Sequence, residues 1–252
     1  MDHGRFNLDG KIAMVSGAGR GIGSAIALGL ADCGADVVIM SRSIGELETV
    51  AGKIKSLGRK VLPIKGDVSR TNELSDFVTQ AVENFHRIDI LVNVAGISLP
   101  GTCMDADEKT WDTMMNVNLK GLFFLSQAVA RVMKEQGGGS IINIASAAGL
   151  RPGIRAVYSI SKAGVIMATQ AAAKEWGKYN VRVNAVVPGL VRTSLTEHVW
   201  DNPDIIQARL KALPAGRAAN AEEIAGAVIY LASDASSYSY GSIITVDGGD
   251  VL

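Results

Sequence analysis

Seven short apolar runs, separated by longer segments with helical spacing, constrain the fold of this chain more than any other feature. The runs are KIAMVSG, DVVIMS, KVLPIKGD, IDILVNVAG, GSIINIAS, VRVNAVVPG and SIITVDGG. Most are continuously apolar rather than alternating, which is typical of strands that are buried on both faces. Strands of this kind alternating with helices predict an α/β fold with a doubly wound, seven-stranded and mostly parallel sheet, flanked by helices.

Three of the segments between the runs show clear helical patterns. One begins at Gly21 and ends near Gly34, a second runs from about residue 107 to 136, and a third begins near Arg155. In the third, one buried face is expected from the spacing of its apolar residues, which are Val157, Ile160, Val165, Ala168, Ala172 and Trp176. Because no linker or repeat interrupts the pattern, residues 1–252 are predicted to form one domain, with a substrate-lid excursion at about 190–220.

Composition excludes several classes of protein. The chain has 25 basic and 25 acidic residues, so it lacks the positive surplus that binding to nucleic acid requires. The N-terminus, MDHGRFNLDGK, has no apolar signal core, and no apolar run approaches the length of a membrane span. Cys33 and Cys103 are expected to be reduced thiols, and His3, His86 and His198 are too scattered for a metal site. A soluble cytoplasmic protein that uses no metal is therefore expected.

The loop after the first predicted strand has the composition of a phosphate-binding turn. Gly17, Gly21 and Gly23 form a Gly-x-x-x-Gly-x-Gly pattern between a strand and an amphipathic helix. Glycines at such positions allow a tight turn and let a diphosphate approach the backbone and the helix N-terminus. A glycine pattern alone is weak evidence, but its position between a strand and a helix favours dinucleotide binding.

The end of the second predicted strand bears on the choice of cofactor. An acidic residue at this position binds the ribose of NAD(H), whereas an arginine favours the 2′-phosphate of NADP(H). Here Ser41 stands at the acidic position, Arg42 follows it, and Arg20 offers a second cation in the glycine loop. The sequence therefore favours NADP(H), although Arg42 could instead be a solvated surface charge in a protein that accepts NAD(H).

Tyr158 and Lys162 in the segment YSISK form a candidate pair for acid–base catalysis. They lie four residues apart on a predicted helix, so their side chains share a face. A tyrosine has a pKa of about 10, and a nearby ammonium lowers the pKa of a phenol towards neutrality. A phenol adjusted in this way donates a proton more readily to a forming alkoxide.

Taken together, these motifs resemble the classical short-chain dehydrogenase/reductase family. The chain carries NVAG (93–96), NVNL (116–119), IASAAG (144–149), YSISK (158–162) and PGLVRT (188–193) after the glycine loop, in the family's order. The resemblance implies a Rossmann-like fold, a homotetramer, and catalysis by Asn118, Ser146, Tyr158 and Lys162. It also implies a larger set of cofactor-binding residues: Gly17, Arg20, Gly21, Ile22, Gly23, Ser41, Arg42, Asp67, Val68, Asn93, Ala95, Gly96, Tyr158, Lys162, Pro188, Gly189, Val191 and Thr193.

The expected reaction is an NADP(H)-dependent interconversion of a ketone and a secondary alcohol, and the substrate is the least constrained part. Apolar residues are expected to line its pocket and favour an apolar ketone: Leu150, Ile154, Val157, Leu190, Leu195 and Trp200. A 3-oxoacyl thioester and a sugar or polyol remain open, since the same apolar residues could pack inward instead. A protein of another class, which senses the cofactor without turnover, is the remaining alternative.

Overall fold

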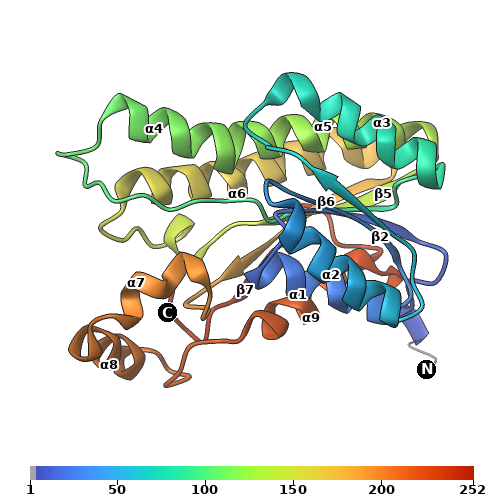
Figure 1. Cartoon of the computed structure of the whole chain (residues 1–252). Coiled ribbons are helices and arrows are strands. Elements are labelled where there is room, and N and C mark those ends of the chain that lie inside the picture. Colours follow the sequence, from blue (N-terminus) through green and yellow to red (C-terminus); the bar gives the residue numbers. More distant parts are fainter. Residues whose placement is uncertain (1–3) are drawn as a thin grey trace.

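A single parallel sheet organises the chain in the computed structural model, which describes residues 4–252 (Figure 1). All seven predicted strands are confirmed, in the order β3-β2-β1-β4-β5-β6-β7, and every neighbouring pair is parallel. Their bounds are β1 Ile12–Ser16, β2 Asp36–Ser41, β3 Val61–Lys65, β4 Ile90–Asn93, β5 Gly139–Ile144, β6 Val181–Pro188 and β7 Ile243–Val246. Strand order reverses between β1 and β4, and in open α/β sheets ligands bind at the carboxyl ends of the strands at such a switch point.

Helices cover both faces of the sheet (Figure 1). Helices α1, α2 and α9 lie on one face and pack in one apolar cluster, while α3, α5 and α6 pack in a second cluster on the other face. The bounds are α1 Gly21–Asp32, α2 Ile44–Ser56, α3 Leu74–Phe85, α4 Glu108–Met115, α5 Leu122–Glu135, α6 Ala156–Trp176, α7 Glu197–Trp200, α8 Pro203–Ala212 and α9 Ala221–Ala232. A π-helical turn, η3 Asn116–Gly121, joins α4 to α5, and short 3₁₀ turns are η1 Gly4–Phe6, η2 Thr71–Glu73, η4 Ala147–Gly149, η5 Gly177–Tyr179, η6 Ser194–Thr196 and η7 Asp234–Ser236.

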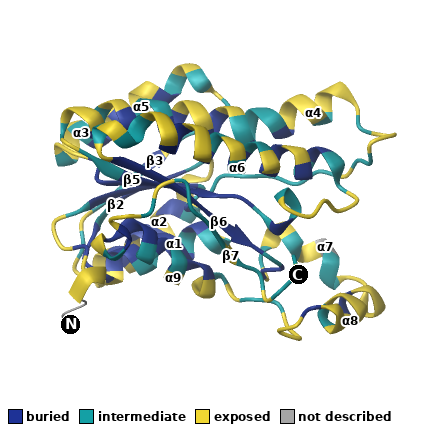
Figure 2. Ribbon diagram, turned by 180° about the vertical axis from the view of Figure 1, so that it is seen from behind, coloured by how far each residue is buried: buried dark blue, intermediate teal, exposed yellow. Residues whose placement is uncertain are grey.

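Burial follows the position of each strand in the sheet (Figure 2). Every residue of β1, β4 and β6 is buried, as expected for strands covered on both faces, and this includes the polar residues Arg182 and Asn184 of β6. The edge strands β3 and β7 are only partly buried, because each has a neighbour on one side alone.

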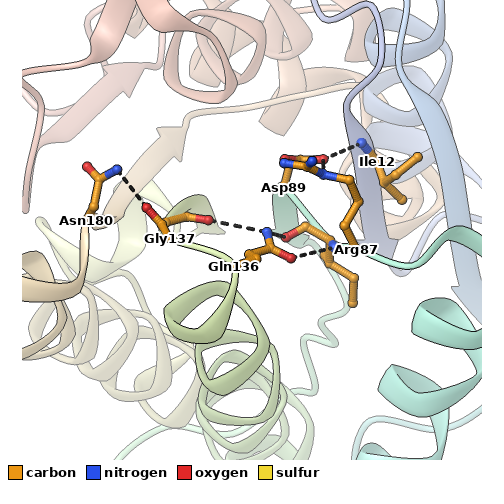
Figure 3. A network of polar contacts seen from close by, with 8 residues as sticks. Ile12, Arg87, Asp89, Gln136, Gly137 and Asn180 are labelled. Carbon is orange, nitrogen blue, oxygen red and sulfur yellow. Dashed lines mark hydrogen bonds and ion pairs between the residues drawn. The ribbon is translucent and has the colours of Figure 1, made fainter.

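The opposite end of the sheet from the switch point carries a polar network that ties the strands together (Figure 3). The Asp89 carboxylate accepts a hydrogen bond from the backbone N–H of Ile12 at 2.9 Å and pairs with the Arg87 guanidinium. Gln136 bridges chain segments there through the carbonyl of Ile88, at 2.6 Å. The network thus satisfies backbone groups at the amino ends of the strands, away from the carboxyl ends where open α/β sheets bind ligands.

The predicted buried face of α6 is partly wrong. Val157 and Val165 are buried, but Ile160 is 45% exposed. The residues buried on this helix include Ser161 and Lys162, which are polar. The spacing of apolar residues does not predict the buried face of α6 correctly, because this helix directs polar side chains towards the carboxyl ends of β4 and β5.

The excursion after β6 has its own small core, formed by Leu190, Ile206 and Leu213 with Trp200 against them. It consists of η6, α7 and α8, and it lies beside the C-terminus (Figure 1). Arg209 on α8 forms an ion pair with Asp250 in the C-terminal segment at 2.6 Å. The excursion is thus a packed helical unit that borders the carboxyl end of the sheet.

Candidate active site and cofactor cavity

The glycine loop adopts a conformation that side chains would block. Gly17 and Gly21 have φ angles of +71° and +56°. A Cβ built on Gly17 would lie 2.7 Å from the backbone nitrogen of Ala95, and one on Gly23 would overlap the carbonyl group of Gly17. The loop therefore passes against the chain that follows β4, and α1 can begin directly at Gly21.

A cavity of about 630 Å³ opens between this loop, the end of β2 and the end of β4. Most of the predicted cofactor residues line it: Gly17, Arg20, Gly21, Ile22, Gly23, Ser41, Arg42, Asp67, Val68, Ala95, Gly96 and Thr193. Thr193 reaches from the excursion to within 3.3 Å of the Cβ position of Gly21. One continuous cavity thus connects segments that are far apart in the sequence, from Gly17 to Leu195.

Six predicted cofactor residues lie outside this lining: Tyr158 and Lys162, which are described below, and four residues at or near the ends of β4 and β6. The Asn93 side chain is buried and donates to Ser126 and Asn143, at 2.8 and 2.9 Å. Val191 is 3% exposed in the apolar core. A Cβ on Gly189 would lie 2.6 Å from the carbonyl oxygen of Asp247, so this glycine packs beside β7, next to Pro188 at the end of β6. These residues shape the walls behind the cavity rather than its surface.

The cavity has the features that a dinucleotide requires. Arg20, the N-cap residue of α1, makes no side-chain cap hydrogen bond, so no cap side chain covers the first backbone N–H groups of α1. Such N–H groups, with the positive end of the helix dipole, bind phosphate oxygens. Ser41 and Arg42 border the same cavity at the end of β2, where the adenosine ribose lies in folds of this type.

Sequence analysis missed Glu46 among the residues that line the cavity. Its carboxylate lies 3.7 Å from the guanidinium of Arg20. A Cβ on Gly19 would lie 2.7 Å from Glu46 Oε2 and 2.9 Å from Ser41 Oγ. Glu46 sits three residues after Ser43, the N-cap residue of α2, so a capping pattern in the sequence could have placed it in the first turn. The other missed lining residues are Gly19, Met40, Ser43, Gly66, Val94, Ile97, Ser98, Val117 and Ser194, while Leu195, which was expected at the substrate pocket, also lines this cavity.

Ser146 and Tyr158 meet beyond the β4 end of this cavity. Ser146 follows β5 as the N-cap residue of η4, and its hydroxyl accepts a hydrogen bond from the backbone N–H of Ala148 at 3.2 Å. Tyr158 lies in the first turn of α6. Burial raises the pKa of Tyr158 above its ordinary value, while a hydrogen bond with Ser146 and the charge of Arg155 act in the opposite direction.

Lys162 lies one turn further along α6 and is buried, with 4% of its surface exposed. Its ammonium donates to the carbonyl of Ile144 at 2.8 Å and lies 5.9 Å from the centre of the Tyr158 ring. Burial lowers the pKa of Lys162 from 10.5 to about 8. Sequence analysis assigned the lowering of the Tyr158 pKa to Lys162, and this is corrected here: the groups that lower it are Ser146 and Arg155, and burial outweighs them.

Asn118 is fully buried in the π-helical turn between α4 and α5. Its side chain accepts from the backbone N–H of Ile97 at 2.8 Å and donates to the Ile97 carbonyl at 2.9 Å. It also donates to Ser161 Oγ at 3.0 Å. The Cβ position of Gly96 lies 3.4 Å from Asn118 Oδ1 and 3.5 Å from Lys162 Nζ, so both side chains converge on the chain that leaves β4.

Among the side chains that the structure describes within residues 4–252, which leave out that of His198, no three histidine, cysteine or carboxylate groups gather where they could hold a metal ion. His3 lies outside the described residues. In the same range of the chain, no helix combines the length and the apolar character that a membrane crossing needs.

Comparison with known proteins agrees with this geometry. A family model described as "Enoyl-(Acyl carrier protein) reductase" matches residues 17–250. The 2-dehydro-3-deoxy-D-gluconate 5-dehydrogenase of Dickeya dadantii is 41% identical, over 97% of this chain and 96% of that protein. The 3-oxoacyl-[acyl-carrier-protein] reductase FabG of Thermotoga maritima is 39% identical, over 98% of this chain and all of that protein (100%).

A solved structure from Beutenbergia cavernae, which contains NADP at low occupancy, superimposes with a TM-score of 0.94. It is 35% identical and covers 98% of this chain and 99% of its own. The family match extends over residues 17–250, which is nearly the whole sequence. The chain therefore belongs to the classical short-chain dehydrogenase/reductase family.

Proposed function

We propose that this oxidoreductase interconverts a ketone and a secondary alcohol with NADP(H) at the carboxyl ends of β4 and β5. The observation that supports this most directly is the meeting of Ser146, Tyr158 and Lys162 close to a cavity suited to a dinucleotide. The nicotinamide, when bound, supplies or accepts the hydride. The residues of the chain then have to orient the substrate oxygen and move one proton.

Each side chain has a distinct role in this proposal. In the reductive direction Tyr158 donates its hydroxyl proton to the substrate oxygen as the carbon–oxygen double bond becomes an alkoxide. Ser146, which is hydrogen-bonded to Tyr158, orients that oxygen. Lys162 lies on the same helix face, with its ammonium 5.9 Å from the centre of the Tyr158 ring, and would bind the nicotinamide ribose of the cofactor. Asn118 fixes the backbone of Ile97 by a hydrogen bond and lies beside Lys162. From there it would support the return of a proton to Tyr158 through Lys162.

NADP(H) is the proposed cofactor, and NAD(H) is the alternative. Arg20, Ser41 and Arg42 border the cavity, so two cations lie at the end where a 2′-phosphate would sit. The carboxylate of Glu46 at the same end opposes an added negative charge. The preference for NADP(H) is therefore proposed to be limited rather than absolute.

A sugar-derived ketone or alcohol is the proposed substrate. The Dickeya dadantii relative carries the name of a sugar-acid dehydrogenase. Several residues expected to form an apolar pocket pack elsewhere: Val157 is buried, and Leu190 belongs to the core of the excursion with Trp200. Of the six expected residues only Leu150, Ile154 and Leu195 remain exposed to a ligand, so an extensive apolar pocket for a ketone has less support than the sequence suggested.

A 3-oxoacyl thioester is the second candidate substrate. The Thermotoga maritima relative is named as a 3-oxoacyl-[acyl-carrier-protein] reductase and covers almost the whole chain. The exposed apolar side chains of Leu150, Ile154 and Leu195 would suit an acyl chain.

A homotetramer is proposed for the assembly, with the α5 and α6 surfaces packed between subunits. An apolar groove of about 480 Å³ lies between these helices, lined by Leu119, Phe123, Phe124 and Met167 among others. Met167 is 64% exposed, and Phe123 and Phe124 are 37% and 40% exposed. Contact of such an apolar patch with water is unfavourable, and burial against another subunit would remove it. A cytoplasmic location is also proposed, since Cys33 and Cys103 are free thiols.

The test is a set of initial rates with NADPH and NADH against keto-sugars and keto-sugar acids, a 3-oxoacyl thioester and apolar ketones. Turnover of one class should fall by about 10²–10⁴-fold in Tyr158→Phe, the range for loss of a general acid. Tyr238→Phe is the matched control, because this tyrosine is 98% exposed. Cofactor binding without turnover of any class would instead favour a sensor, and full activity in Tyr158→Phe would contradict the assigned roles.

A further inference from the structure

Ser161 is a buried serine that lies between the two proposed catalytic residues of α6. It comes three residues after Tyr158 and directly before Lys162, and it is 0% exposed. Its hydroxyl donates a hydrogen bond to the backbone carbonyl of Tyr158 at 2.7 Å. The same oxygen accepts a hydrogen bond from Asn118 Nδ2 at 3.0 Å. One hydroxyl thus joins the turn that carries the proposed proton donor to the π-helical turn between α4 and α5.

The connection continues from Asn118 to the wall of the cofactor cavity. Asn118 Oδ1 accepts from the backbone N–H of Ile97, and Asn118 Nδ2 donates to the carbonyl of the same residue. Ile97 lines the cavity. Because Asn118 holds both backbone groups of Ile97 and Ser161 holds Asn118, two side chains connect the cavity wall to the backbone of Tyr158. A shift of the first turn of α6 relative to this wall would break at least one of these hydrogen bonds.

Helix formation alone does not explain a serine at this position. Serine forms helices less readily than alanine, and a hydroxyl that bonds back to the preceding turn tends to bend the helix. A buried polar group is also costly unless it is hydrogen-bonded. Alanine occupies other buried positions of α6, which include Ala172 and Ala173. The hydroxyl of Ser161 is therefore better explained by its contact with Asn118 than by the stability of the helix itself.

We propose that Ser161 is a positioning residue, whose hydroxyl holds Tyr158 in register with the cavity wall through Asn118. This inference rests on the proposed oxidoreductase function and adds a residue to the site that carries it. Reacting groups have to be held within about 0.5 Å of the productive geometry, and a misplacement of about 1 Å lowers rates roughly 100-fold. Because Ser161 acts through other residues, its loss should slow the chemical step and leave binding of cofactor and substrate largely unchanged.

Thr169 provides a matched control on the same helix. It is also 0% exposed, and its hydroxyl donates to the carbonyl of Val165 at 2.8 Å and accepts from Asn143 Nδ2 at 2.9 Å. It lies about two turns further along α6, away from Tyr158. Ser161→Ala and Thr169→Val therefore remove equivalent buried hydroxyls, each bonded to a helix carbonyl and to an asparagine, but only the first breaks the connection to Tyr158.

The first experiment measures kcat and KM with NADPH and the substrate class that the wild-type protein turns over fastest. Ser161→Ala should lower kcat by roughly 10–100-fold and change each KM by less than about threefold, whereas Thr169→Val should retain the wild-type kcat. Added to Asn118→Ala, Ser161→Ala should slow the reaction no further, because the two side chains act as one unit. Ser161→Cys keeps a weaker donor of similar size and should give an intermediate kcat if the alanine variant fails to fold.

Three results of these rate measurements would overturn the inference while leaving the oxidoreductase function intact. They are an unchanged kcat in Ser161→Ala, an equal loss of kcat in Thr169→Val, and a loss in Ser161→Ala that adds fully to the loss in Asn118→Ala.

Deuterium exchange at the backbone N–H of Ile97 separates failure of this inference from failure of the proposed function, because it requires no turnover. Asn118 Oδ1 accepts this N–H at 2.8 Å, so a loosened Asn118 leaves it open to exchange. Ser161→Ala should speed the exchange by at least about 10-fold, and Thr169→Val should leave it unchanged. Faster exchange in Ser161→Ala, without turnover of any substrate by the wild-type protein, would support the connection and count against the catalytic proposal. Unchanged exchange in Ser161→Ala would overturn the connection.

Discussion

Replacing Lys162 by methionine should make the protein more stable near neutral pH although it removes a proposed catalytic group. Lys162 is buried, and burial lowers its pKa from 10.5 to about 8. The native state therefore carries a poorly solvated ammonium at pH 7, whereas methionine fills similar space without a charge.

The magnitude follows from the pKa. At about 1.4 kcal/mol for each pKa unit, the change from 10.5 to about 8 costs the native state about 3 kcal/mol at pH 7. The substitution also removes the hydrogen bond from Nζ to the Ile144 carbonyl, which offsets about 1–2 kcal/mol. The expected net gain is about 1–2 kcal/mol, or an increase of about 2–8 °C in Tm for a chain of this length.

The pH dependence provides the sharper test. Between pH 8 and 10.5 the unfolded chain keeps the proton on Lys162 and the native chain releases it, so wild-type stability rises with pH across this range. The advantage of Lys162→Met should therefore be complete below about pH 8, shrink as pH rises, and reverse near pH 10.

The assay is thermal or urea unfolding from pH 6 to 10, at one protein concentration so that assembly contributes equally. Lys174→Met is the control, because Lys174 is exposed on the same helix and should show no such dependence. A Lys162→Met protein that is less stable at pH 7, or that differs from wild type by the same amount at every pH, would refute the reasoning.

Three further predictions follow from contacts at the cavity and the α5–α6 surface. Glu46→Gln removes a carboxylate from the cavity and should therefore raise the ratio of kcat/KM for NADPH to kcat/KM for NADH by roughly 3–10-fold. Glu48→Gln, on the exposed side of α2, should leave this ratio unchanged. Gly121→Ala should lower the free energy of unfolding, measured by urea denaturation, by about 1–3 kcal/mol, because its Cβ would overlap a backbone carbonyl. The control Gly226→Ala places its Cβ in open space and should be neutral or stabilising. Met167→Arg should reduce the mass measured by light scattering from four chains towards one, and an unchanged mass would place the subunit contacts elsewhere.

Local pattern was sufficient for the architecture. Continuous apolar runs, glycine turns and helical spacing each depend on a few neighbouring residues, so the seven parallel strands and the helix starting at Gly21 could be predicted from the sequence. The helical excursion after β6 also lies in a segment that was expected to be irregular and partly helical, and Pro203 begins a helix there. Ordered motifs placed Ser146, Tyr158 and Lys162 in one site for the same reason.

Contacts between distant segments needed the tertiary structure. The approach of Arg155 to Ser98 and of Glu46 to Gly19 depends on how α6 and α2 sit on the sheet, which no local spacing encodes. Likewise Asn93 could have faced the cavity or the core, and the structure puts it in a buried network with Ser126.

The charge state of the site also depended on the fold. The sequence predicted a tyrosine whose pKa is lowered by its lysine neighbour, because the two are four residues apart on one helix. In the folded chain both side chains are largely removed from water, so burial raises the pKa of Tyr158 and lowers that of Lys162. Sequence alone determined that Tyr158 and Lys162 lie on one helix face; only the tertiary structure decided their solvation, because desolvation is set by all the chain segments that pack around them.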